Sequence, residues 1–379
     1  CQAMVTLDST PKANISPERM VLLLGKRDSP ADGVQDYSEY LAQALRRRGI
    51  ETEIARVEWH SEGWARALRK LRAQSVKWEG SWVVLQYTAL SWSRRGFPLG
   101  ALAVLRSLRC QKLRCAAVFH EYRRQSGGAK WAGQVRGAFQ DWVIRQIYSE
   151  VDIAIFADPL DAITWLPCDR NRAAFIPIGA NLPEPQRPME ASNIRSSEIQ
   201  TVAIYCLSDP PNLLNELRDI SMAIRVAAAG RKLRVVFLGR GTTEAQDEIT
   251  RTFDGTYAEI SNLGIRDAKA VRDTLISSDV MLCVRGEMNP TRGSAIAGIV
   301  CGLPIVGYGT SEKAFPISEA GVRLVPYRDS AALAANLAQV LSDGQLREQL
   351  IGTNRKAQEK FFSWDVIADR MIEALNSSR

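Results

Sequence analysis

No apolar run in the sequence approaches the ~20 residues that a helix needs to cross a bilayer. The first apolar run, residues 21–24, ends at once in a glycine and two basic residues. It is also shorter than the core of a signal peptide, which contains about 7–15 apolar residues. We therefore expect a protein that works in the cytoplasm.

Histidine is scarce, with only His60 and His120 among 379 residues. The seven cysteines include no CxxC pair, and Cys206, Cys283 and Cys301 lie in apolar segments that are typical of a protein core. A zinc site needs cysteine and histidine ligands at close spacing, so none is expected. The sequence predicts no metal and no bound cofactor.

The composition is that of a globular protein, with 46% apolar and 24% charged residues. A chain of 379 residues is too long for one ordinary hydrophobic core and fits two domains. The net charge of +7 is unevenly distributed, because residues 66–145 contain sixteen basic and three acidic residues. A basic segment of this kind attracts an anionic partner.

Tryptophans accompany these basic residues, a mixture that suits the headgroup layer of an anionic membrane. They are Trp78, Trp82, Trp92, Trp131 and Trp142. The alternative is a solvated basic face with the tryptophans in the core. No nucleic-acid partner is expected, because the basic segment is the only feature that would favour one.

Residues 97–109 of this segment predict an amphipathic or buried helix, with Arg94 and Arg95 before it and Arg106 and Arg109 at its end. Such a helix can lie in a membrane interface, where its arginines contact anionic headgroups. The competing interpretation packs the helix on a sheet and leaves its arginines in solvent.

Short β-rich runs alternate with helical stretches, which predicts parallel sheets with crossover helices. The strand candidates are residues 20–25, 51–57, 82–87, 114–120, 151–156, 173–177, 201–206, 233–239, 279–284 and 304–308. The helix candidates, besides 97–109, are a helix that ends at Gly49 and residues 213–229, 266–277, 294–301, 330–341, 345–361 and 364–375.

A stretch rich in proline and polar residues follows residue 183 and interrupts the alternation, so we expect a linker there. The sequence thus predicts an α/β fold with two Rossmann-like domains, residues 1–185 and 198–360. Ligands of such sheets bind beyond the carboxyl ends of the strands. Two domains that face each other would enclose a cleft for a small molecule.

The loop after the first strand leads into a helix near Gly33, which can take a positive φ and admit a ligand close to the backbone. The alternative is an ordinary strand-to-helix turn. His120 follows the strand 114–120 and would point toward the cleft, although a lone histidine is often structural. Arg240 and Gly241 form a tight turn after residues 233–239, without the third glycine of a dinucleotide fingerprint.

Residues 284–295 are the richest stretch, because a strand ends there, a polar loop follows and a helix begins. The helix begins with the small residues Gly293, Ser294 and Ala295, whose N–H groups are open to a phosphate. The alternative is a surface loop with an ordinary helix cap.

Two arginines flank this helix start. Arg285 and Arg292 can neutralise a diphosphate through forked hydrogen bonds. In the same loop, Glu287 or Asn289 can bind sugar hydroxyls. Charge, glycine and cap residues together favour a donor-binding site.

Six stretches, in their order along the chain, carry a resemblance to known enzymes. They are GKRDSPADGVQDYSEYLAQALRRRG, IPIGANLPE, LRVVFLGRG, SSDVMLCVRGE, CGLPIVGYGTSEKAFPISEAGVRLVP and FFSWDVIADRMIEAL. Together they resemble family 4 of the retaining glycosyltransferases, also called group 1, over nearly the whole chain.

The resemblance implies the GT-B fold, with an acceptor-binding first domain, a second domain that binds a nucleotide-sugar, and a last helix, residues 361–379, that packs back on the first domain. It implies transfer of a hexosyl unit from a nucleoside diphosphate sugar to a hydroxyl of a lipid-linked or polysaccharide acceptor, with retention of configuration. A place at the inner face of a membrane would suit such an acceptor.

By position, Gly33 matches the family's first-loop glycine near the donor phosphates, and His120 matches a histidine that approaches the donor sugar. Gly293 to Ala295 match the helix start that holds the diphosphate. These matches favour a functional His120.

The sequence departs from the family at two positions, because Asn289 and Ala297 stand where the family usually has glutamates. Glu287, two residues earlier, is the candidate to replace the first glutamate. The family's basic pair is also missing from residues 207–212. Its candidate replacements are Arg240, Arg285 and Arg292.

Two alternatives remain open at this point. An inverting enzyme would need a general base, and the candidates are Asp28, Asp32, Asp36, Glu121 and His120. The loss of both glutamates would also fit a protein that binds a sugar nucleotide without catalysis.

Overall fold

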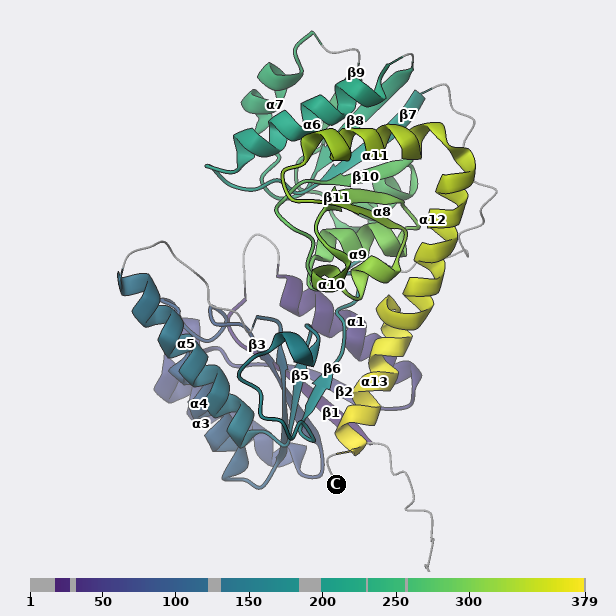
Figure 1. Cartoon of the computed structure of the whole chain (residues 1–379). Helices are drawn as coiled ribbons and strands as arrows, with labels where there is room; N and C mark the ends of the chain where they lie inside the picture. The colour runs from purple at the N-terminus through teal and green to yellow at the C-terminus, as the bar shows by residue number, and fades with distance from the viewer. Residues whose placement is uncertain are drawn as a thin grey trace, which may run out of the picture.

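Two parallel six-stranded sheets, one from each half of the chain, organise the computed structural model (Figure 1). The structure describes residues 18–27, 32–121, 131–183, 199–229, 231–255 and 258–377. Both sheets carry helices on their two faces, so the predicted α/β class with two Rossmann-like domains is confirmed. The expected linker lies mostly outside the described residues, and the exact domain boundaries stay a prediction.

The first sheet has the strand order β2-β1-β3-β4-β5-β6. Its strands are β1 Arg19–Leu24, β2 Glu51–Arg56, β3 Trp82–Tyr87, β4 Arg114–Phe119, β5 Ile153–Phe156 and β6 Ala173–Phe175. Its helices are α1 Gly33–Arg47, α2 Trp59–Glu62, α3 Trp64–Ser75, α4 Leu99–Arg109 and α5 Trp131–Glu150, with short 3₁₀ turns at Val76–Trp78 and Leu160–Ala162.

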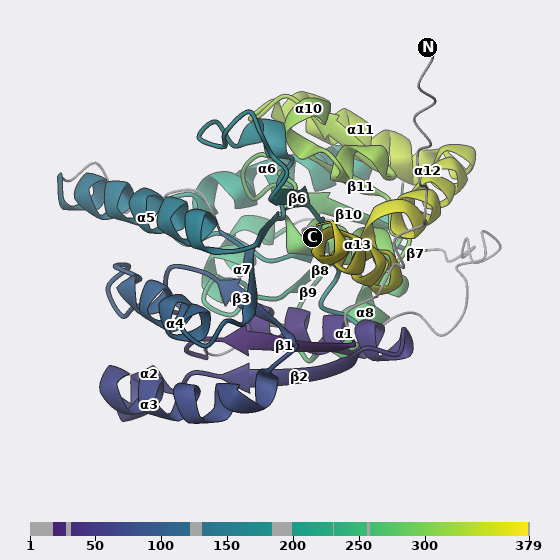
Figure 2. The ribbon, with the colours of Figure 1, turned by 90° about the horizontal axis from the view of Figure 1, so that it is seen from below.

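Strand side chains alternate between the two faces of this sheet and build two separate apolar cores. Val21 and Leu23 of β1 pack with α3, α4 and α5, whereas Met20 and Leu22 pack with α1 and the last helix. Figure 2 shows these two helical layers on opposite sides of the strands. Burial on both faces explains why the strands read as nearly continuous apolar runs.

The second sheet has the order β12-β11-β10-β7-β8-β9. Its strands are β7 Ile199–Tyr205, β8 Lys232–Leu238, β9 Ala258–Asn262, β10 Val280–Cys283, β11 Ile305–Tyr308 and β12 Val322–Val325. Its helices are α6 Leu213–Ala227, α7 Gln246–Phe253, α8 Ala268–Ile276, α9 Gly293–Val300, α10 Ser311–Ala314, α11 Ser330–Ser342 and α12 Gly344–Ala357, with a 3₁₀ turn at Ile317–Glu319.

The chain then returns to the first domain. A π-helical turn, Gln358–Phe362, joins α12 to α13 Trp364–Asn376, and α13 packs against α1 (Figure 1). Ser363 caps α13 by accepting a hydrogen bond from the backbone N–H of Val366. The expected helix that crosses back is therefore confirmed.

Trp364 anchors α13 on the first domain. Its indole Nε1 donates to the carbonyl oxygen of Ala180 at 3.0 Å, and its ring stacks on Tyr40. Gly179 makes the approach possible, because a Cβ there would lie 2.7 Å from the indole ring. On the outer side of the helix pair, Arg47 donates to Asp365 at 2.8 Å.

The helix predicted at residues 97–109 is α4, and its apolar side faces the core of the first domain. Arg106 pairs with Glu150 at 2.8 Å, and Arg109 pairs with Asp152 at 2.7 Å. Most apolar side chains of this helix are buried, which fits the competing interpretation of a helix packed on the sheet, whereas Phe97 and Leu99 at its start are exposed. A membrane contact of this helix stays a prediction. Within the described residues, no helix is long and apolar enough to cross a membrane.

The tryptophans of the basic segment divide into two groups. Trp78, Trp82 and Trp92 are fully buried, as the alternative interpretation expects. Trp131 and Trp142 on α5 are exposed, at 78% and 46% of their surface. Exposed apolar residues blur the helical pattern of α5, which explains why the sequence did not predict this helix.

The sequence also did not predict β9 and β12. Both are edge strands of the second sheet and are largely half-buried. Each mixes polar and apolar residues, AEISN in one case and VRLV in the other. An edge position needs less apolar surface than a central strand, so the apolar signal is weak there.

We expect Trp364→Ala to lower the free energy of unfolding by about 3–5 kcal/mol, because it leaves a cavity and an unpaired carbonyl at Ala180. Urea unfolding followed by circular dichroism measures this loss. Trp131→Ala, at an exposed position, is the matched control and should change stability by less than about 0.5 kcal/mol. Equal losses in the two variants would contradict the anchoring role of Trp364.

Candidate functional site

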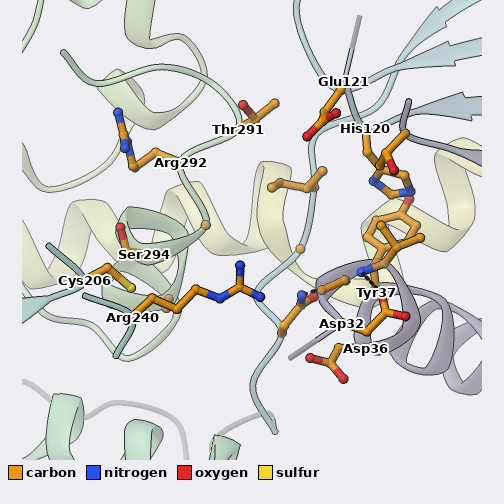
Figure 3. A pocket seen from close by; sticks show the side chains of 18 of the residues that line it. Asp32, Asp36, Tyr37, His120, Glu121, Cys206, Arg240, Thr291, Arg292 and Ser294 are labelled. Atoms are coloured by element: carbon orange, nitrogen blue, oxygen red, sulfur yellow. Dashed lines mark hydrogen bonds between the residues drawn. The ribbon is translucent and has the colours of Figure 1, made fainter. Parts of the chain in front are cut away.

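A cavity of about 870 Å³ lies between the two domains. It is lined by the loops that follow β1, β3 and β4 on one side and β7, β8 and β10 on the other. Figure 3 shows Arg240, Arg292, Ser294 and Cys206 across the cavity from Asp32, Asp36, Tyr37, His120 and Glu121. The carboxyl ends of both sheets thus meet at one cavity, as the strand pattern predicts.

Charge divides the cavity into two unlike walls. All acidic residues that line it within the described chain come from the first domain, and they are Asp32, Asp36 and Glu121, beside the basic residues Lys26, Arg27 and Arg94 of the same domain. The second domain contributes no acidic residue to the described lining, but four arginines: Arg240, Arg266, Arg285 and Arg292. Its wall therefore favours an anion with more than one negative charge.

Three of these arginines lack a neutralising carboxylate. In the described part of the chain, Arg266, Arg285 and Arg292 form no ion pair. Arg292 is the most buried of them, and this burial lowers the pKa of its guanidinium. A partly buried cation without a partner carboxylate is a strong binding group for a ligand anion.

Helix α9 begins at the same wall. No side chain caps its N-terminus, and the N–H groups of Gly293 and Ser294 have no acceptor among the described residues. The positive end of the helix therefore adds to the arginine charge. The Arg292 side chain is held beside it, because Nη2 donates to the carbonyl oxygen of Glu287 at 3.0 Å.

The cavity includes only part of the predicted donor site. Arg240, Arg285, Arg292, Gly293, Ser294 and Asn289 line it. Ala295 is fully buried behind the helix start. Gly241 does not line the cavity, since it has φ +80° and packs against the carbonyl of Leu207, which a Cβ would approach to 2.5 Å.

Glu287 is not brought into the cavity lining either. Its carboxylate pairs with Lys313 at 3.4 Å, and its backbone carbonyl holds Arg292. Asn289 does line the cavity, where its Oδ1 accepts from the N–H and the hydroxyl of Thr291. Asn289 therefore stabilises the loop before α9 on the side of the cavity, whereas Glu287 stabilises it through contacts outside the cavity lining.

Asp32 and Gly33 lie at the start of α1 and line the opposite wall. Asp32 caps the helix by accepting from the N–H groups of Val34 and Gln35, and it pairs with Arg56 at 3.6 Å. The expected positive φ at Gly33 is wrong, because this residue is already the first residue of the helix. Gly33 contributes to the cavity by having no side chain, which leaves space beside Asn181.

His120 lies where β4 ends and contacts both the cavity and the core. Its Nε2 lies 2.8 Å from Oε1 of Gln86, and Tyr37 packs edge-on against its ring at 4.8 Å. The Gln86 amide nitrogen faces the Val84 carbonyl, which leaves Oε1 to accept from Nε2–H. Nδ1 then carries a lone pair.

Burial lowers the pKa of His120 to about 4, against the opposing effect of Asp32. The ring is therefore neutral at pH 7, and it is a weak base. A neutral imidazole suits a hydrogen bond to a sugar hydroxyl better than removal of a proton.

Two other carboxylates at the cavity are candidate bases. Burial raises the pKa of Asp36, and the nearby carboxylates of Glu39 and Asp32 add to this effect. Glu121 follows His120 and lines the cavity. Asp28 lies outside the described residues.

Several cavity residues did not follow from sequence reasoning. Arg266 lies just beyond β9, an edge strand that the sequence did not predict. Asn181 belongs to the stretch IPIGANLPE, but only the fold places its amide against Gly33 at 2.9 Å. Tyr37 belongs to the core of the first domain, and it also borders the cavity.

In the ranges that the structure describes, no group of three or more His, Cys, Asp or Glu side chains is arranged to hold a metal ion. Cys206 and Cys283 lie beside Arg292, but burial raises the pKa of both thiols, to about 12 for Cys283. They are therefore neutral thiols rather than nucleophiles.

The pKa of His120 predicts how pH acts on stability. The folded ring has a pKa of about 4 and the unfolded ring about 6.5, so the unfolded chain takes up the proton first. The stability that neutral His120 provides is complete above pH 6.5 and is lost as pH falls toward 4, by up to about 1.4 kcal/mol per pH unit.

We expect the stability difference between the wild-type protein and His120→Gln to shrink from pH 7.5 to pH 5. Urea unfolding at several pH values measures it. His60→Gln, at an exposed position on α2, is the matched control. A difference for His120→Gln that does not change with pH would show that the histidine is not held neutral by burial.

Comparison with known proteins gives the fold. No family model matches the sequence, and no curated protein matches it either. Among solved structures, sucrose-phosphate synthase from Thermosynechococcus elongatus is similar at a TM-score of 0.67 and 17% identity, over 93% of this chain and 97% of that one. HepE from Anabaena, solved with UDP and glucose, is similar at 0.62 and 12% identity, over 95% and 100%.

A third similar structure is a protein of Listeria monocytogenes described as a UDP-N-acetylglucosamine 2-epimerase. Its TM-score is 0.62 at 11% identity, over 96% of both chains. One fold therefore serves a sucrose-phosphate synthase and a protein described as an epimerase, and the site must decide the activity. The two facing Rossmann-like domains, the cavity between them and the returning helix α13 give this chain the GT-B fold.

Proposed function

We propose that the protein is a glycosyltransferase that moves a hexosyl unit from a nucleoside diphosphate sugar to a hydroxyl group. The observation that carries the proposal is the second domain's wall, where four arginines and the uncapped start of α9 meet without a lining carboxylate. HepE, of the same fold, was solved with UDP and glucose and with UDP-glucose. A nucleoside diphosphate is an anion of the kind that such a wall binds.

The diphosphate would lie at the N–H groups of Gly293 and Ser294, with Arg292 and Arg285 beside it. As the bond between the sugar and the diphosphate breaks, negative charge grows on the leaving oxygen. Fixed donors in a partly dry cavity stabilise that charge without reorganisation. This role needs no metal ion.

His120, as a neutral ring whose Nε2–H is bound to Gln86, would accept one hydrogen bond from a hydroxyl of the donor sugar through Nδ1. Its pKa of about 4 makes it a poor base, which favours a retaining reaction in which the leaving phosphate takes the acceptor proton. An inverting reaction would instead use Asp36, whose raised pKa suits a general base, or Asp32 or Glu121.

We assign the acceptor, a lipid-linked or polysaccharide glycan, to the first domain's wall, where the acidic residues lie. Membership of glycosyltransferase family 4 and a cytoplasmic location are parts of the same proposal. The order of the six similar stretches along the chain supports family 4.

A second candidate function is binding of a sugar nucleotide without catalysis. The observation that favours it is the lining itself, where Asn289 and Ala297 stand in place of the family's two glutamates. Transfer or hydrolysis separates the two functions, because a binding protein would release neither sugar nor nucleotide from any donor.

We further propose that the protein works at the inner surface of a membrane, with α5 as its contact. Trp131, Val135, Ala138 and Trp142 are exposed and recur at intervals of three and four residues, so they lie along one side of the helix. Arg145, also exposed, follows one turn later. Tryptophan beside basic residues suits an anionic headgroup layer.

A thermal-shift screen against UDP-, GDP-, ADP- and dTDP-sugars tests the donor proposal. A donor at 100 times its dissociation constant should add about 2.7 kcal/mol of stability. Release of free nucleotide from that donor then tests catalysis. Stabilisation without release would favour the binding protein, and no stabilisation by any of the four would sink the donor proposal.

Arg285→Ala combined with Arg292→Ala should weaken nucleotide binding by at least about 100-fold, since each charged hydrogen bond contributes ~1.5–3 kcal/mol. Calorimetric titration with the nucleoside diphosphate measures the loss. Arg225→Ala, on the outer surface of α6, is the matched control and should bind normally. Unchanged affinity in the folded double variant would remove the phosphate assignment.

The membrane proposal predicts co-sedimentation with anionic vesicles and not with neutral ones. Rising salt should release the protein, because surface charges are screened within ~8 Å at physiological ionic strength. Trp131→Ser combined with Trp142→Ser should reduce vesicle binding about tenfold, and Arg225→Ala should leave it unchanged. No binding to anionic vesicles at low salt would rule out this contact.

A further inference from the structure

A second hollow, of about 700 Å³, lies on the first domain beside the cavity. Helices α2, α3 and α4 and the loop after β3 form it, and we call it the apolar groove. Its floor and walls are mainly apolar and aromatic: Trp59, Trp64, Leu68, Trp92, Phe97, Leu99 and Ala103. Apart from Ser93 and Arg94, its residues do not line the cavity.

The walls of the apolar groove are fixed by packing. Trp59 and Trp64 stack at 4.9 Å with nearly parallel rings. Gly100 lets Trp64 lie on α4, because a Cβ there would come within 1.9 Å of the ring. The groove is therefore part of the folded domain and does not depend on a side chain in solvent.

Two of the groove's tryptophans, Trp59 and Trp92, offer it no hydrogen-bond donor. The Trp59 indole N–H donates to the carbonyl of Ser91 at 2.9 Å, and that of Trp92 donates to the carbonyl of Gln86 at 2.9 Å. A sugar chain carries hydroxyl groups that need partners at every unit. A hydrocarbon chain needs none, and it gains from every apolar contact.

Positive charge lies at one end of the apolar groove. Arg94 and Arg95 line it and are exposed, and neither forms an ion pair among the residues described. Arg94 is oriented by a hydrogen bond to the carbonyl of His60 at 2.9 Å. Two arginines beside an apolar floor suit a molecule that joins a hydrocarbon chain to an anionic group.

The groove and the cavity meet at this charged end. Ser93 and Arg94 line both of them. A molecule with its hydrocarbon chain in the groove and its anion at Arg94 would therefore project its next group into the cavity. That group would lie on the wall that we assign to the acceptor.

From this continuity we infer that the acceptor is lipid-linked, and that the apolar groove binds its hydrocarbon chain while Arg94 and Arg95 bind the phosphate next to that chain. The inference rests on the proposed function, and it chooses between the two acceptor classes named there. A soluble polysaccharide would leave both the groove and its arginines without a partner.

Farnesyl phosphate, below its micelle concentration, is the probe for this site, with farnesol and inorganic phosphate for comparison. Calorimetric titration of the full chain should show that farnesyl phosphate binds at least about tenfold more tightly than either. Ala103→Phe fills the groove and should weaken farnesyl phosphate binding about tenfold or more. Ala335→Phe, at an exposed position of α11 in the second domain, is the matched control and should bind normally.

Two further variants keep the test independent of folding. Leu99→Asp places a charge in the groove at an exposed position and should weaken farnesyl phosphate binding as Ala103→Phe does. Arg94→Gln combined with Arg95→Gln should weaken farnesyl phosphate binding but leave farnesol binding unchanged. UDP binding should be the same in Ala103→Phe and in the wild-type protein.

The outcomes separate the two levels of the proposal. Binding of nucleotide-sugars without binding of farnesyl phosphate would overturn this inference and leave the transferase intact. Failure of all nucleotide-sugars to bind would instead overturn the proposed function. Equal affinity for farnesol and farnesyl phosphate would overturn the inference and assign the groove to general lipid contact. The same conclusion would follow if the wild-type protein did not bind farnesyl phosphate but bound phosphatidylglycerol vesicles, and Ala103→Phe abolished that vesicle binding.

Discussion

The parallel direction of the strands is the constraint on which the site depends. Every strand in a parallel sheet ends at the same edge, so the loops that follow β7, β8 and β10 gather their arginines in one place. The first sheet does the same for the acidic residues at α1 and β4. Helix α13, held by Trp364 against Ala180, ties the end of the chain to the first domain and keeps the two edges facing each other.

The charge asymmetry of the cavity is the basis on which we assign the donor and the acceptor to different domains. An arginine wall with an uncapped helix start attracts a polyanion, whereas the opposite wall mixes carboxylates with Lys26, Arg27, Arg94 and a neutral His120. Arg292 contributes most to this asymmetry, because burial raises the free-energy cost of keeping its guanidinium charged without a bound anion. The same domain that carries the acids also carries the apolar groove, so both features that we assign to the acceptor lie on one side.

Sequence reasoning predicted the central strands well, because burial on both faces leaves long apolar runs. It did not predict β9 and β12, where an edge position lowers the apolar signal, or α5, where exposed tryptophans hide the period of the helix. In the site, Arg285, Arg292 and Gly293 do line the cavity. Glu287 does not, because a carboxylate two residues from the expected position points to Lys313 in this loop.

The sequence by itself determined the two-domain α/β fold and the loops that would carry the site, because apolar periodicity and helix-start residues are local properties. Only the tertiary structure decided which charges share a wall, how far His120 is buried, and which tryptophans are free to meet a lipid. These properties depend on residues far apart in the chain. Arg94, for example, lines both the cavity and the groove because the loop after β3 packs beside α2.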